Sequence, residues 1–103
     1  MANIAKLMKQ AAQMQRGMQE AQEKLAQTSV EAEAGGGAVK VVMSCANEVV
    51  SLTISPDLVA SNDPKLLEDV VMSAMNQAAA KVRETTEREM GRVTGGMSIP
   101  GLM

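Results

Sequence analysis

A chain of 103 residues is long enough for one domain, and a domain of this size has only a thin core. Hydrophobic residues make up 46% of the sequence, but none is Phe, Trp or Tyr. The interior must therefore be filled by Val, Leu, Ile, Met and Ala, each of which buries a small area. The formal charge of -2 argues against a uniformly basic nucleic-acid binder. A partner subunit would bury more apolar surface and stabilise so small a core, so we expect a homodimer.

The charge is unevenly distributed along the chain. Residues 1–25 carry four basic and two acidic side chains, and no acidic residue precedes Glu20. Residues 26–80 carry two bases and seven acids, whereas residues 81–103 carry four bases and three acids. Base is therefore concentrated at the two ends of the chain and acid in its middle.

The residue inventory argues against an enzyme. Histidine and tyrosine are absent and Cys45 is the single cysteine, so a Cys/His zinc cluster, a Cys/His nucleophile pair and an intrachain disulfide are all excluded. We therefore expect no catalysis, no cofactor, no metal site and no small-molecule substrate. An apolar leader and an apolar run of membrane-spanning length are also missing, so we expect a cytoplasmic protein that does not enter membranes.

The chain order predicts an α+β domain of the form α-β-β-β-α. From Asn3 to about Gln27, apolar residues fall in a heptad seam that predicts one long amphipathic helix, part of which must project or meet another chain. Period-2 alternation then predicts three antiparallel strands in a meander, with turns at Gly35–Gly37 and at Asn47-Glu48 and a stop at Ser55-Pro56-Asp57.

A second long helix is expected after this sheet. Asp63-Pro64 is a strong helix start, and the apolar face continues to Val82 before a charged stretch that Gly91 and Gly95-Gly96 should end. We treat residues 1–103 as a single domain in which 93–103 form a mobile tail.

Several features have an ordinary explanation that we prefer to a chemical one. Gly35–Gly37 suit a hairpin turn better than a ligand cradle, because they lie between two predicted strands. Glu31 and Glu33 suit a solvated strand face, and Cys45 continues an apolar strand face. The ten methionines fall mainly on the apolar stripes, which favours core or dimer contacts over metal or haem binding.

Each predicted helix carries a basic face. Lys6, Lys9, Gln13 and Arg16 follow one another at steps of 3, 4 and 3 along an acid-free ridge that could contact successive phosphates, although periodicity alone favours a solvated face. On the second helix Lys81, Thr85, Arg88 and Arg92 share a face. Glu84 lies within reach of Lys81 and Arg88, so Arg92 is expected to be the freest of this group.

Short segments in a fixed order resemble the YbaB/EbfC family. They run from Leu7-Met8-Lys9-Gln10-Ala11-Ala12-Gln13-Met14-Gln15, through Gly35-Gly36-Gly37-Ala38-Val39-Lys40-Val41 and Val50-Ser51-Leu52-Thr53-Ile54-Ser55-Pro56, to Thr94-Gly95-Gly96-Met97. The resemblance implies a tweezer-like homodimer and a bacterial nucleoid-associated protein that binds double-stranded DNA with little sequence specificity. It further implies a role in organising the chromosome and modulating gene expression.

Carried onto this chain, the resemblance assigns DNA contacts to the first and last helices. The residues are Lys6, Lys9 and Arg16, with Arg83, Arg88 and Arg92. The absence of aromatic residues argues against a stacking platform for single strands. The alternative is a protein-interaction module that binds a partner through its projecting amphipathic helices, which salt dependence would distinguish from DNA binding.

Overall fold

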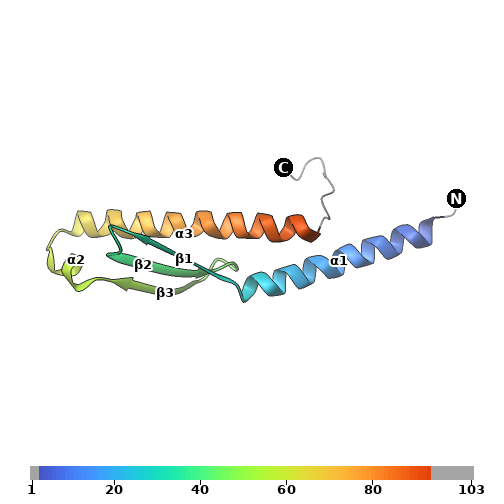
Figure 1. Cartoon of the computed structure of the whole chain (residues 1–103), viewed down its shortest axis with the longest axis horizontal. Coiled ribbons are helices and arrows are strands. Elements are labelled where there is room, and N and C mark those ends of the chain that lie inside the picture. The colour runs from blue at the N-terminus through green and yellow to red at the C-terminus, as the bar shows by residue number, and fades with distance from the viewer. Residues whose placement is uncertain (1–2, 94–103) are drawn as a thin grey trace.

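The computed structural model describes residues 3–93, and Figure 1 shows an elongated α+β arrangement with principal extents of 72 × 24 × 16 Å. The elements in chain order are α1 (Ile4–Ala26), β1 (Ser29–Ala34), β2 (Val39–Ser44), β3 (Val49–Ile54), α2 (Pro56–Ala60) and α3 (Pro64–Val93). The α-β-β-β-α order predicted from the sequence is therefore confirmed, with one short helix added.

The three strands form an antiparallel meander in the order β1-β2-β3. Val41 pairs with Ala32 on one side and with Leu52 on the other, and a register shift follows Val42 in the β2–β3 pair. The glycine turn joins β1 to β2, and all three of its residues have positive φ. Asn47, in the second turn, also has a positive φ, which asparagine tolerates better than most residues.

The core lies between α3 and the β1–β2 part of the sheet. Val39 and Val41 of β2 are fully buried, and Ala74 and Ala78 of α3 are buried opposite them. Alanine carries only a methyl group, so α3 can approach the sheet closely at these positions. Cys45 and Met43 continue the same buried strand face, as the alternation predicted.

Helix α1 packs against the part of α3 that extends past the sheet, and the two helices run antiparallel (Figure 1). Ala21 and Leu25 are buried in this contact, and Gly17 comes so close to α3 that a Cβ there would lie 3.3 Å from Val93 Cγ1. Every residue from Asn3 to Gln13 is exposed. The first half of α1 therefore projects, as its length suggested.

Three boundaries differ from the prediction or extend it. Pro56–Ala60 form α2 instead of a simple stop, because Ser55 Oγ accepts a hydrogen bond from the Leu58 backbone N–H at 3.2 Å and caps the helix. Gly91 does not end α3, which continues to Val93. The predicted tail, except for Val93, lies outside the described residues.

The glycine turn generates a stability prediction. A Cβ on Gly35 would lie 2.8 Å from Val70 Cγ1 of α3, and the φ of Gly35 is +66°. An L residue in this region costs roughly 1–2 kcal/mol, and overpacking costs roughly 1–3 kcal/mol more. We expect Gly35→Ala to lower the free energy of unfolding by about 2–5 kcal/mol in a urea titration.

Gly36 provides the matched control. Its φ is +68°, but nothing lies within 4 Å of the position that its Cβ would occupy. Gly36→Ala should therefore cost only the backbone term of roughly 1–2 kcal/mol. Equal losses in the two variants would mean that the contact between the turn and Val70 does not constrain the fold.

Candidate nucleic-acid interface

Three of the four basic residues of α1 precede its close contact with α3 at Gly17. Lys6, Lys9 and Arg16 are all exposed, and within residues 3–93 none of them forms a hydrogen bond or an ion pair. With Gln13 between them they form a ridge about 15 Å long, from the helical rise of roughly 1.5 Å per residue. Their charges are therefore available to a ligand outside the chain.

One three-residue ion network shows how this ridge sits relative to α3. Lys24 Nζ of α1 lies 3.0 Å from Glu89 Oε1, and Arg92 Nη1 lies 3.6 Å from Glu89 Oε2. Lys24 follows Lys6 by a whole number of helical turns, so both residues lie on the same side of α1. The ridge of α1 and Arg92 of α3 therefore border the same side of the helix pair.

Arg88 shares this side of α3, because it lies one turn before Arg92. Its Nη2 lies 3.3 Å from Glu84 Oε1, and both side chains are well exposed. Lys81 lies on the same side of α3, nearer the start of the helix, and donates a hydrogen bond from Nζ to the backbone carbonyl oxygen of Glu31 at 2.7 Å. We call the surface formed by Lys6, Lys9, Arg16, Arg88 and Arg92 the arm face.

The structure bears on two expectations about α3. Arg92, expected to be the freest cation of its group, is more exposed than Arg88, but it also pairs with Glu89 one turn earlier, at 3.6 Å. Arg83 is exposed and has no ion pair within residues 3–93. It lies about two and a half helical turns before Arg92, however, so it projects from the opposite side of α3.

Other candidate chemistry finds little support in the part of the chain that the structure describes. Glu31 and Glu33 are exposed, as expected for a solvated strand face. No group of three or more His, Cys, Asp or Glu side chains within residues 3–93 could hold a metal ion. Burial raises the pKa of the Cys45 thiol, which favours the unreactive protonated form at neutral pH.

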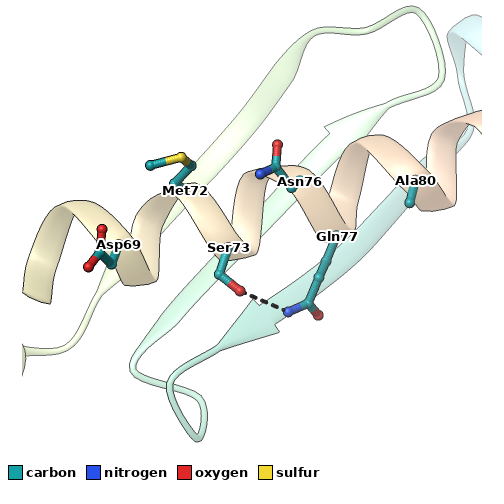
Figure 2. Close-up of a pocket in the computed structure, with 6 residues that line it drawn as sticks. All are labelled: Asp69, Met72, Ser73, Asn76, Gln77 and Ala80. Carbon is teal, nitrogen blue, oxygen red and sulfur yellow. Dashed lines mark hydrogen bonds between the residues drawn. The ribbon is translucent and has the colours of Figure 1, made fainter.

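A surface hollow of about 560 Å³ lies along α3 and is lined by that helix alone (Figure 2). Met72 and Asn76 point to one edge of the helix, whereas Ser73 and Gln77 point to the other and share a hydrogen bond of 3.2 Å. A hollow lined by a single helix lacks the converging walls of a small-molecule site. Separately, none of the helices within residues 3–93 has the length and apolar character needed to cross a membrane.

These features define a two-layer α+β protein whose long helices extend past the sheet and carry an exposed basic face. The model of the YbaB/EbfC DNA-binding family matches residues 1–97, and the chain belongs to this family.

Curated relatives agree with this assignment over nearly the whole chain. A nucleoid-associated protein of Pelotomaculum thermopropionicum is 45% identical and is matched over 97% of this chain and 95% of its own. The nucleoid-associated protein NMC1380 of Neisseria meningitidis is 48% identical, with 98% of this chain and 92% of the relative covered.

A solved structure supports the fold. The crystal structure of the uncharacterized protein HP0035 from Helicobacter pylori matches with a TM-score of 0.74 at 25% identity. The match covers 85% of this chain and 92% of that chain. The α-β-β-β-α arrangement is therefore shared with an experimentally determined structure.

The positions of the arginines predict unequal contributions to DNA affinity. Arg88 lies on the arm face and its exposed partner Glu84 holds it weakly, whereas Arg83 lies on the other side of α3. We expect Arg88→Gln to weaken binding to a random-sequence duplex more than Arg83→Gln does, although both remove one positive charge. Fluorescence anisotropy at low salt measures the difference, and a larger loss for Arg83→Gln would place the DNA on the opposite side of α3.

Proposed function

We propose that this protein binds duplex DNA as a homodimer and helps to organise the bacterial nucleoid. The observation that carries the proposal is the set of cations Lys6, Lys9 and Arg16 of α1, which are unpaired within residues 3–93 of a chain whose net charge is negative. Membership of a DNA-binding family and relatives named as nucleoid-associated proteins support it. The matching site assignment is Lys6, Lys9, Arg16, Arg88 and Arg92 on the arm face, with Arg83 as a contact from the other side of α3.

The chemistry of the arm face fits contact with phosphates better than the reading of bases. Lysine and arginine side chains along a helix neutralise successive phosphates and release counter-ions, which supplies affinity without sequence information. The acidic residues of the middle of the chain lie on β1, in the β2–β3 turn, on α2 and at or just before the start of α3, away from the projecting half of α1. Binding should therefore be weak, sensitive to salt and nearly independent of sequence. A DNA-binding protein of the nucleoid acts in the cytoplasm, which is the location we propose.

A homodimer is supported by apolar surface that the single chain leaves uncovered. Helix α3 covers β1 and β2 but extends little over β3, where Leu52 is 46% exposed and Val50 is 61% exposed. Strand β3 is also an edge of the sheet, with one side of its backbone unpaired within residues 3–93. Exposed apolar edges of this kind are normally covered by another chain.

Met72 of α3 adds to the same uncovered surface. Val70 faces the β1–β2 turn through Gly35, and Met72 lies two residues later, about 200° around the helix and thus on the side away from β1. Its side chain is 54% exposed. We propose that a second copy covers Val50, Leu52 and Met72, which would enlarge a core that is thin in the single chain.

The protein-interaction alternative depends on the apolar side of the projecting half of α1. Ile4, Leu7 and Met8 are all highly exposed and suit a partner helix. The family assignment favours DNA, and the response to charge reversal separates the two functions.

Charge reversal on α1 tests DNA binding. The double variant Lys9→Glu with Arg16→Glu puts two negative charges where phosphates should lie, so we expect affinity for a random-sequence duplex to fall by at least about tenfold at low salt. The control is Lys40→Glu with Lys65→Glu, which changes the net charge equally on the sheet and at the start of α3. Equal losses in the two variants, or no loss in either, would contradict a site on α1.

The proposed dimer surface is tested by hydrodynamic mass. Leu52→Glu places a charge on the uncovered face of β3 and should convert the dimer into a monomer of 10.8 kDa in sedimentation velocity measurements. Thr53→Glu is the control, since neighbouring residues of a strand point to opposite faces. A monomeric wild-type protein, or a Leu52→Glu variant as dimeric as the control, would rule out this surface.

A further inference from the structure

Glu89 occupies an unusual position among the charged residues described. Its side chain is only 17% exposed, and its two carboxylate oxygens face one cation from each long helix, Lys24 and Arg92. The other ion pairs found in residues 3–93 join residues within α3. Glu89 therefore connects α1 to α3 on the side of the helix pair that carries the arm face.

The local packing holds Glu89 in this position. The two helices approach closely where Gly17 faces Val93, and a crevice of about 290 Å³ runs between them past Ala21, Lys24, Glu89 and Arg92. A carboxylate that is largely shielded from water interacts more strongly with nearby cations than an exposed one does. The pairs of Glu89 should therefore be firmer than the Glu84–Arg88 pair, in which both side chains are more than half exposed.

Both cations held by Glu89 remain accessible from outside. Lys24 is 59% exposed and Arg92 is 66% exposed, so a phosphate can reach either one. A phosphate that binds them must displace Glu89, and the displaced carboxylate would stay close by without a partner. Lys24 and Arg92 thus contribute less to DNA affinity than Lys6, Lys9 and Arg16, whose charges are unpaired.

We propose that Glu89 is an internal counter-ion that competes with the DNA backbone for Lys24 and Arg92 and so keeps the affinity of the arm face low. The inference rests on the proposed DNA-binding function. It assigns a specific cause to weak binding, namely that one carboxylate neutralises two of the cations on the DNA-facing side. It also adds Lys24, which lies outside the set of residues carried over from the family.

The decisive variant is Glu89→Gln, which removes the charge and keeps the shape of the side chain. Two freed cations should bind up to two more phosphates, and each added contact steepens the slope of log K against log salt by about 0.9. We expect a slope about 1–2 units steeper and an affinity about fivefold higher at low salt. Glu87→Gln is the matched control, because it removes the same charge from an exposed residue of α3 that has no ion pair within residues 3–93.

A double-mutant cycle separates release of the cations from a change in helix packing. Lys24→Gln and Arg92→Gln should each reduce DNA affinity more in the Glu89→Gln background than in the wild-type protein. Additive effects would overturn the inference, and so would a Glu89→Gln variant that binds no better than the Glu87→Gln control. Weaker binding by Glu89→Gln would also overturn it, by showing that Glu89 supports the interface instead of restraining it.

The titration of the wild-type protein tests DNA binding separately from the counter-ion role of Glu89. Binding by the wild-type protein together with identical Glu89→Gln and Glu87→Gln titrations would overturn the counter-ion role alone. No binding by the wild-type protein at low salt would overturn the proposed function and with it this inference. Thermal unfolding monitored by circular dichroism confirms that each variant remains folded.

Discussion

The close packing of α3 on β1 and β2 determines the shape of the rest of the molecule. Ala74 and Ala78 allow α3 to lie against Val39 and Val41, and a chain without aromatic residues has little other means of building a core. This core covers little of β3, and its buried residues on α3 end at Val82. As a result, β3 keeps an apolar face uncovered, and the second half of α3 becomes the surface on which α1 packs.

The same packing separates the charges into paired and unpaired groups. Where α1 lies against α3, Lys24 and Arg92 pair with Glu89. Before this contact, Lys6, Lys9 and Arg16 form no ion pair within residues 3–93, although Glu20 follows Arg16 by about one helical turn. A protein of net charge -2 can in this way present a local basic surface. For DNA binding, the position of each acid relative to the arm face matters more than the total charge.

Local sequence signals account for most of the fold, and contacts between distant residues account for what was missed. Asp63-Pro64 starts α3 as expected, and the Asp63 side chain accepts a hydrogen bond from the Leu66 backbone N–H. Helix α2 escaped prediction because Ser-Pro-Asp signals a turn and a short helix equally well. The pairing of Glu89 with Lys24 could not be foreseen, since the whole sheet and most of α3 lie between them in the sequence, and this pairing is what joins the two basic faces.

The measurement that tests the central claim most directly is the salt dependence of wild-type binding to a random-sequence duplex of about 30 base pairs. Contacts from Lys6, Lys9 and Arg16 of one arm predict a slope of log K against log salt of about -3, and engagement of both arms of a dimer about twice that. A slope near zero, or no binding at low salt, would contradict a phosphate-binding arm face. Either result would favour a partner protein held by the apolar side of α1.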